Sequence, residues 1–457
     1  MDPSPASRSL ALALVLVMVL PAMASAVPAS TEGTRLNDGF HSFPEIVAKM
    51  RSAAEDHPDI VAMYDLGQLY PNGDGSPKTS HEGRHVWALK ISDNVHVNES
   101  DEPDILYVGM HHAREWMSTE LMVWLFEHIL AGYGTNDTIT GIVDTRELWL
   151  IPVFNPDGFV YTETDDRTWR KNRRDNGDGT FGVDPNRNYG YKWGYDDSGS
   201  SPDPSSPTYR GPAPFSEPIT QIMRDLAYDV GFKLAISFHT YSAVMCYPPA
   251  YKKEHAPHYE FFRELGRRMN QHNGYDYGDV RDGILYTVNG GMDDFMYYNT
   301  SCLSFTYEMN TLAQGGFYVD ASLIEPTCSM NYEAALEIAK APTDLYRMFQ
   351  GGIQGHVLDP RGEPVEGASV HVELLAGDTM DVVTGPNGTF QFHAPYDRFY
   401  QVNVTKEGHS SHSEMHQVLW RDRLTELNIS IRDNVAPRIP RVAASHEGEE
   451  RTEFGIG

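Results

Sequence analysis

Short apolar runs alternate with helical spacing over most of the chain. Four apolar runs predict buried strands: 105–110, 147–154, 232–238 and 301–307. Between the first two, residues 117–130 have the apolar spacing of a helix. Because strands that alternate with helices indicate an α/β domain, we expect a mixed, mostly parallel central sheet flanked by helices, within residues 38–350.

The pattern changes near residue 353. From there to residue 432, short alternating segments are separated by turn sequences such as 357–362 and 384–388. This pattern predicts a small C-terminal all-β sandwich over 353–432. Residues 434–457 are polar and contain proline, so we expect them to form a flexible tail.

The first 26 residues have the pattern of a secretory signal peptide. Arg8 precedes an unbroken apolar run from Leu10 to Leu20, and an A-x-A cleavage site ends at Ala26. The run is too short to cross a bilayer of about 30 Å as a helix, and a short N-terminal anchor is the alternative. No later segment has a spanning length, so we expect a secreted protein without a stable membrane span.

Composition and charge exclude several classes of protein. The chain is 40% hydrophobic and 22% charged, which is typical of a globular protein. Its formal net charge of −28 argues against nucleic acid as a partner. Cys246, Cys302 and Cys328 do not have the spacing of a CxxC zinc site, and one disulfide with one thiol or three thiols are both open.

Candidate metal ligands follow two of the predicted strands. His112 comes after the first strand, Glu115 lies at the start of the following helix, and His239 closes the strand at 232–238. A catalytic zinc site needs three protein ligands and one open position. A tight strand-to-helix turn can direct the first two side chains at one ion. We therefore predict one Zn²⁺ per chain, bound by His112, Glu115 and His239.

Similar motifs elsewhere are weaker candidates for a metal site. H-x-x-E also occurs at 96–99 and 446–449, where no buried strand precedes it. A formal H-E-x-x-H at 81–85 would need to be helical for both histidines to share one face. The turn-rich segment 71–80 precedes it and Gly83 interrupts it, so we predict an exposed loop there.

Peptide hydrolysis at zinc also needs a base for water and a cation for the oxyanion. Glu308 follows the last strand and is a candidate base, because glutamate is rarely buried unpaired; a structural ion pair is the alternative. Arg170 lies among the five cations of 167–174, which form either a positive wall or a solvated loop. Arg187, within 184–188, could bind a carboxylate bidentately, although that stretch alone is typical of a turn.

In this order, six stretches resemble the zinc metallocarboxypeptidases of the carboxypeptidase A/B family. They are HAREW at 112–116, WRK at 169–171, DPNRN at 184–188, SFHTYS at 237–242, GGMDD at 290–294 and FTYE at 305–308. The resemblance covers about residues 40–350. It implies an enzyme that hydrolyses the C-terminal bond of peptides or proteins.

The resemblance also implies a role for each matching residue. Zinc would be bound by His112, Glu115 and His239, and the catalytic residues would be Glu308, as general base, and Arg170, which holds the oxyanion. Substrate would be bound by Asn186, Arg187, Tyr286 and Asp293. The first two clamp the terminal carboxylate, the mobile tyrosine caps the substrate, and Asp293 lines the specificity pocket.

In the family that the chain resembles, the second residue after the Gly-Gly pair lines the specificity pocket, so the resemblance implies that Asp293 gives a preference for basic C-terminal residues. A hydrophobic or mixed preference is the alternative, because the segment 247–250 lacks the acid that regulatory-type enzymes often supply there.

The β-rich region at 353–432 resembles the transthyretin-like domain that follows the catalytic domain in the regulatory N/E-type branch. Only about a dozen residues separate Ala26 from the start of the catalytic region, so we expect no long pro-segment and no zymogen control. Two other functions remain possible on this fold. One is an inactive binding protein, against which Glu308 and Arg170 argue. The other is a zinc deacylase or amidase for small molecules, against which the carboxylate clamp argues.

Overall fold

The computed structural model describes residues 39–100, 102–256, 258–341, 352–374, 379–393, 398–418 and 424–432. The signal peptide predicted at 1–26 and the tail predicted at 434–457 lie outside these ranges. Within them, no helix is both long enough and apolar enough to cross a membrane.

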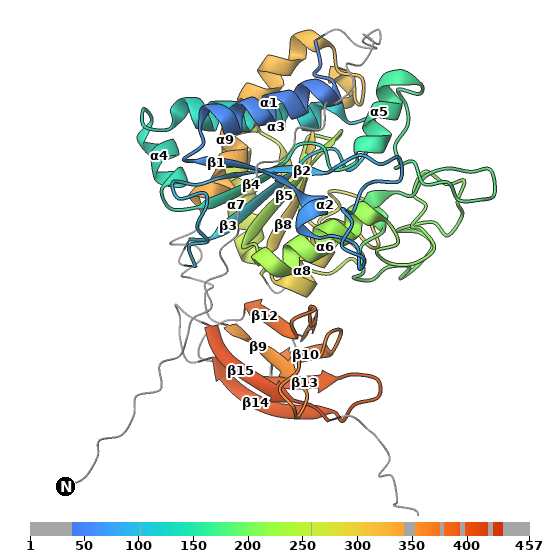
Figure 1. Ribbon diagram of the computed structural model, residues 1–457, viewed down its shortest axis with the longest axis vertical. Coiled ribbons are helices and arrows are strands. Elements are labelled where there is room, and N and C mark those ends of the chain that lie inside the picture. The colour runs from blue at the N-terminus through green and yellow to red at the C-terminus, as the bar shows by residue number, and fades with distance from the viewer. Residues whose placement is uncertain are drawn as a thin grey trace, which may run out of the picture. The chain divides into compact units, whose positions relative to one another are not determined.

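An eight-stranded sheet forms the centre of the first domain, in the order β1-β2-β4-β3-β5-β8-β6-β7 (Figure 1). Its strands are β1 (Val61–Asp65), β2 (Trp87–Ile91), β3 (Asp104–Val108), β4 (Glu147–Ile151), β5 (Leu234–Thr240), β6 (Val244–Cys246), β7 (Asp276–Gly278) and β8 (Leu303–Met309). The central strands β4, β3, β5 and β8 run parallel, whereas β2 is antiparallel to β4 and β6 is antiparallel to β8. The predicted mixed, mostly parallel sheet is confirmed.

Helices cover both faces of this sheet. The helices are α1 (Phe43–Asp56), α2 (Leu66–Leu69), α3 (Trp116–Gly132), α4 (Asp137–Val143), α5 (Pro156–Thr164), α6 (Pro218–Val230), α7 (Tyr259–Asn273), α8 (Met292–Thr300) and α9 (Ile324–Lys340). Figure 1 shows α1, α3 and α9 on one side of the sheet, with α6 and α8 on the other. Short 3-10 turns lie at η1 (Pro185–Arg187), η2 (Leu312–Gln314) and η3 (Ala321–Leu323).

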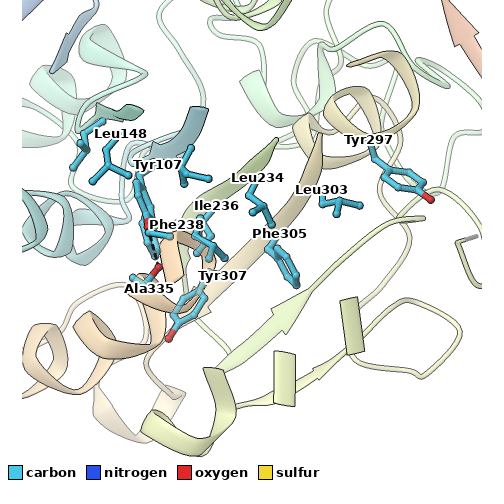
Figure 2. Packing of buried hydrophobic residues seen from close by; sticks show 14 of the residues in the cluster. Tyr107, Leu148, Leu234, Ile236, Phe238, Tyr297, Leu303, Phe305, Tyr307 and Ala335 are labelled. Atoms are coloured by element: carbon cyan, nitrogen blue, oxygen red, sulfur yellow. Dashed lines mark hydrogen bonds between the residues drawn. The ribbon is translucent and has the colours of Figure 1, made fainter. Parts of the chain in front are cut away.

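Side chains of the central strands alternate between two hydrophobic cores. Tyr107, Ile236 and Phe238 belong to the core under α3 and α9, whereas Leu106 and Ala235 belong to the core under α6 and α8. Figure 2 shows the first core, where the Tyr107 hydroxyl donates a hydrogen bond to the Ala335 carbonyl at 3.0 Å. Burial on both faces explains why these strands read as continuous apolar runs.

All four predicted strands differ from the structure at one or both ends, and the strand predicted at 105–110 spans Asp104–Val108. The strand predicted at 147–154 stops at Ile151, because Asn155 accepts a hydrogen bond from the N–H of Gly158 and caps α5. In contrast, β5 and β8 each extend two residues further than their apolar runs, to Thr240 and Met309. His239 and Glu308 therefore lie within the paired strands rather than after them.

The connection from α5 to α6, residues 165–217, contains η1 and is held by buried polar side chains. The carboxylate of Glu217 accepts hydrogen bonds from Asn172 at 2.6 Å and from Arg174 at 3.0 Å. Asn188 donates to the carbonyl of Arg210 at 2.9 Å. These contacts fix the loop where regular backbone pairing is sparse.

The C-terminal domain consists of two sheets, β11-β10-β13-β14 and β12-β9-β15. The strands are β9 (Gly352–Leu358), β10 (Ser369–Leu374), β11 (Thr379–Val383), β12 (Thr389–His393), β13 (Arg398–Thr405), β14 (His412–Val418) and β15 (Leu424–Ser430). Alternate residues of β10, β12 and β13 are buried, and the rings of Phe392 and Tyr400 lie 6.4 Å apart. The predicted all-β sandwich is confirmed.

Candidate active site

The carboxyl ends of β3 and β5 bring the three predicted metal ligands together. His112 lies in the turn after β3, Glu115 is the N-cap residue of α3, and His239 is the penultimate residue of β5. The Nδ1 atom of His239 lies 3.1 Å from Nδ1 of His112 and 2.9 Å from Oε2 of Glu115. Nδ1 of His112 lies 2.9 Å from Oε1 of Glu115, and all three side chains are buried.

This donor set fits a zinc ion. On the outer side of each ring, His112 Nε2 lies 3.2 Å from Oδ1 of Asp184, and His239 Nε2 lies 2.9 Å from Oγ of Ser237. When both outer nitrogens donate, the two Nδ1 lone pairs and the Glu115 carboxylate face one point, which a cation satisfies. The separations of about 3 Å suit ligands that each lie about 2.0–2.2 Å from one ion.

The H-E-x-x-H segment has no such geometry. Residues 81–85 form a turn rather than a helix, as predicted. His81 pairs with Glu217 at 2.7 Å, and His85 pairs with Asp65 at 2.7 Å. Each histidine thus has its own carboxylate, and the segment forms no common metal site.

Asp184 connects the metal ligands to Arg170. Its Oδ2 accepts hydrogen bonds from Nε and Nη2 of Arg170 at 3.0 and 2.8 Å, while its Oδ1 faces His112. Burial disfavours the charged form, but Arg170 and His112 together hold the pKa of Asp184 well below its usual range. Sequence reasoning assigned no role to Asp184, because a lone aspartate before a proline is also typical of a turn.

Of the basic run at 167–174, Arg170 lines the pocket beside the metal ligands. The guanidinium of Arg167 packs over Trp116 at 3.8 Å, and that of Arg173 packs over Tyr161 at 3.7 Å. The run therefore forms neither a positive wall nor a solvated loop, because its cations have separate partners.

A pocket adjoins the metal ligands and contains every predicted catalytic and substrate-binding residue. Its lining is His112, Arg170, Asn186, Arg187, Cys246, Tyr247, Ala250, Val280, Leu285, Tyr286, Val288, Gly291, Met292, Asp293, Asp294, Thr306 and Glu308. Tyr286 is 61% exposed, whereas the other lining residues are buried or half-buried.

Arg187 and Asn186 form one wall of the pocket. The Arg187 side chain is buried, and its Nη1 donates to the Asn186 carbonyl at 2.7 Å. Its Nε has no hydrogen-bond partner in the described part of the chain. Oδ1 of Asn186 accepts a hydrogen bond from the backbone N–H of Met292 at 2.9 Å. This hydrogen bond fixes the orientation of the Asn186 amide, so its NH₂ group is available as a donor. This arrangement offers N–H donors to an anion.

Glu308 lies in β8 and reaches the same pocket. Its Oε2 is buried and has no hydrogen-bond partner among the described residues, and no cation lies within ion-pair distance there. Burial and the negative charge of Glu115 raise the pKa of Glu308 to about 8, against the opposing charges of Arg170 and Arg187. A structural ion pair, the alternative role for Glu308, therefore has no cationic partner among the described residues.

Asp293, in the first turn of α8, lies at the pocket wall and is buried. Its carboxylate accepts hydrogen bonds from the hydroxyls of Ser304 at 2.9 Å and Thr306 at 2.5 Å. Burial raises the pKa of Asp293 to about 6, with the two hydroxyls opposing the shift. The adjacent Asp294 instead accepts backbone N–H groups of Ala250 and Tyr251, at 2.9 and 3.1 Å.

Comparison with known proteins gives the class of protein that this fold and site define. The zinc carboxypeptidase family profile matches residues 46–334, and the carboxypeptidase regulatory-like domain profile matches residues 352–432. The first match covers more than half of the chain. The chain therefore belongs to the zinc carboxypeptidase family, and it is a metal-dependent peptide hydrolase with a transthyretin-like C-terminal domain, as its sequence motifs predicted.

Individual relatives include both A-type and B-type enzymes. The chain is 34% identical over 323 residues to a zinc carboxypeptidase of Saccharothrix mutabilis subsp. capreolus, covering 67% of this chain and 70% of the relative. It is 34% identical over 307 residues to carboxypeptidase A1 of Mus musculus (65% and 69% covered). It is 30% identical over 318 residues to carboxypeptidase B of Astacus astacus (67% and 98% covered).

Solved structures agree with this assignment. Thrombin activatable fibrinolysis inhibitor superposes with a TM-score of 0.59 at 28% identity, covering 66% of this chain and 76% of that chain. Carboxypeptidase A from Helicoverpa armigera superposes with a TM-score of 0.58 at 26% identity, covering 66% and 74%.

Proposed function

We propose that the protein is a secreted zinc carboxypeptidase that removes single residues from the C-termini of peptides or proteins and prefers lysine or arginine there. One observation carries the proposal: a single pocket beside the metal ligands holds a glutamate with an unpartnered oxygen and a buried arginine with an unpartnered N–H. In this proposal, residues 38–350 form the catalytic domain and residues 353–432 form the β-sandwich.

His112, Glu115 and His239 would hold one zinc ion. When bound, zinc supplies Lewis acidity, which polarises a carbonyl and lowers the pKa of a bound water. Glu308 takes the proton from the attacking water and delivers it to the leaving amine, and its carboxylate reaches the pocket with one oxygen that has no hydrogen-bond partner among the described residues. Arg170, fixed by two hydrogen bonds to Asp184, directs its remaining N–H groups at the developing oxyanion.

Asn186 and Arg187 restrict the reaction to chain ends. A guanidinium fork binds a carboxylate bidentately. Because Arg187 is buried, a substrate that presents an uncharged group instead of a carboxylate would leave its charge unpaired, which is costly. The exposed ring of Tyr286 then covers the bound residue and excludes water from it.

Asp293 supports the preference for basic residues. At neutral pH a carboxyl with a pKa of about 6 is mostly ionised, and the buried carboxylate of Asp293 has two hydroxyl partners but no ion-pair partner among the described residues. An incoming lysine or arginine supplies that cation, while Val280, Leu285 and Val288 contact its methylene stem. The hydrophobic alternative rests on the same apolar residues without the charge pair.

A panel of blocked dipeptides tests this function. We expect benzoylglycyl-arginine and benzoylglycyl-lysine to be cleaved at least tenfold more efficiently than benzoylglycyl-phenylalanine, and 1,10-phenanthroline to stop all three reactions. The C-terminal amide of the arginine substrate serves as the control for the carboxylate clamp. No cleavage of any substrate by zinc-loaded protein would support the inactive binding protein, and faster hydrolysis of N-acetyl amino acids would support the deacylase.

Export is a separate part of the proposal and is supported by the sequence pattern at 1–26. N-terminal sequencing of the protein recovered from the medium of the producing cells should begin at Val27. Retention in the cell pellet with Met1 intact would contradict export.

A further inference from the structure

A chain of buried polar side chains lies behind the outer nitrogen of His239. His239 Nε2 lies 2.9 Å from Oγ of Ser237, and the same Oγ lies 3.0 Å from Nδ1 of His111. On its far side, His111 Nε2 lies 2.9 Å from the hydroxyl of Tyr189. All four side chains have 0% relative exposure, so each must find its hydrogen-bond partners within this chain.

The directions of these hydrogen bonds follow from the metal site. If Nδ1 of His239 binds an ion, its proton must lie on Nε2, and that N–H donates to Ser237 Oγ. The serine hydroxyl then donates its own proton to His111 Nδ1. Because Nδ1 of neutral His111 accepts, its Nε2 carries the proton and donates to Tyr189. Each of the three hydrogen bonds from His239 to Tyr189 thus has one donor and one acceptor.

The alternative direction shows why His111 matters. A serine hydroxyl both donates and accepts, so it has no preferred direction of its own. Without an acceptor at His111, its best remaining acceptor is Nε2 of His239, and that hydrogen bond places the histidine proton on Nδ1, where the metal must bind. His112 avoids this ambiguity because its outer partner, Asp184, is a carboxylate that can only accept.

We propose that His111 is a positioning residue of the metal centre, which through Ser237 holds His239 in the tautomer that binds zinc. Tyr189 anchors the other end of the series and follows the clamp residues Asn186 and Arg187 in the chain. The inference rests on the proposed metal site. The sequence pattern predicts no role for this histidine, which precedes the proposed metal ligand His112 in the chain.

Zinc affinity of purified full-length variants tests the proposal. Zinc dissociation constants would be measured by competition with a chromogenic chelator, alongside melting temperatures of the zinc-free and zinc-loaded forms. His111→Phe removes both nitrogens, His111→Gln places its carbonyl oxygen near Nε2, and His111→Asn places it near Nδ1. Phe154→Leu is the matched control, because its ring packs 4.5 Å from that of His111 without a polar atom.

We expect His111→Phe and His111→Gln to weaken zinc binding about tenfold or more, as losses of outer partners of metal ligands do. His111→Asn, which keeps the acceptor for Ser237, should stay within about threefold of the wild type, as should Phe154→Leu. Zinc binding of His111→Phe within threefold of the wild type overturns the proposal, and so do equal losses in the Asn and Gln variants.

Two further variants decide the matter if the His111 variants do not fold. Ser237→Ala breaks the series at its centre, and Tyr189→Phe removes only a hydroxyl while the ring stays packed. Unchanged zinc affinity in both overturns the proposal, and about tenfold weaker binding in Ser237→Ala supports it. Failure of the metal site itself is recognised separately, since wild-type protein would then bind no stoichiometric zinc, or His239→Ala would bind it equally well.

Discussion

His239 and Glu308 lie directly opposite each other in the register of the parallel strands β5 and β8. This pairing places the proposed metal ligand and the proposed general base at the same level of the sheet, on neighbouring strands. Because β5 is buried along its length and β8 is buried except at Thr306 and Glu308, which are half-buried, their register is fixed by packing on two faces. The separation of base and ligand is therefore determined by the fold rather than by a flexible loop.

Replacing Glu308 with glutamine should abolish most of the activity. The amide keeps the size of the side chain but cannot accept the proton of water, so kcat should fall by about 10²–10⁴. Steady-state kinetics on benzoylglycyl-arginine would measure the loss, and zinc content by atomic absorption should stay at the wild-type value. A kcat within tenfold of the wild type would exclude Glu308 as the base.

Replacing Asp293 with asparagine should remove the preference for basic residues. A hydrogen bond to a charged group contributes about 1.5–3 kcal/mol, so the ratio of kcat/KM for arginine over phenylalanine substrates should fall about 10- to 100-fold. Asp294→Asn is the comparison, because that carboxylate is occupied by the N–H groups of Ala250 and Tyr251. Equal losses of selectivity in both variants would contradict a specific role for Asp293.

The same preference should depend on pH. Burial raises the pKa of Asp293 to about 6, so the carboxyl is mostly neutral at pH 5 and mostly ionised at pH 7. Arginine substrates stay cationic throughout this range, and the arginine-over-phenylalanine ratio of kcat/KM should therefore rise as pH rises through 6. The ratio measured at constant ionic strength should be flat for Asp293→Asn. A wild-type ratio that stays constant or falls as pH rises would contradict this role of Asp293.

Replacing Arg187 with lysine should reduce discrimination for a free C-terminus. Lysine keeps the charge but loses the fork that matches a carboxylate. We expect the wild type to favour the free acid of a dipeptide over its amide, and the variant to lose about 100-fold of that ratio, mainly through a higher KM for the acid. An unchanged acid-over-amide ratio would show that Arg187 does not bind the C-terminal carboxylate.

His258 should make stability depend on pH. It is buried with its Nδ1 at 2.7 Å from the Tyr297 hydroxyl, and burial lowers its pKa from 6.5 to about 4. Between those values the unfolded chain binds a proton that the folded chain does not, so the free energy of unfolding falls as pH falls. Relative to His258→Gln, the wild type should lose about 2 kcal/mol from pH 7 to pH 5. Urea unfolding at both pH values would measure this, and a difference that does not change with pH would contradict it.

Much of this fold follows from local sequence pattern, and much of the site does not. The strand that contains Ile236 is buried on both faces, so its sequence is an apolar run from which the strand can be predicted. The polar residues at the end of that run include His239, which made it a candidate metal ligand. The exact strand ends at Thr240 and Met309 were missed, because pairing continues through polar residues once their neighbours are in register. Asp184 and His111 were also missed, since each contacts at least one partner that lies more than 70 residues away in the sequence.

The carboxylate of Asp184 contacts the proposed metal ligand His112 with one oxygen and the proposed oxyanion-binding residue Arg170 with the other. The proposed metal site and the proposed oxyanion site consequently depend on the same carboxylate. An attempt to redesign this enzyme for another metal, by altering the outer partner of His112, would also release Arg170. Metal selectivity and stabilisation of the transition state are thus coupled through Asp184, and directed evolution would have to change both properties together.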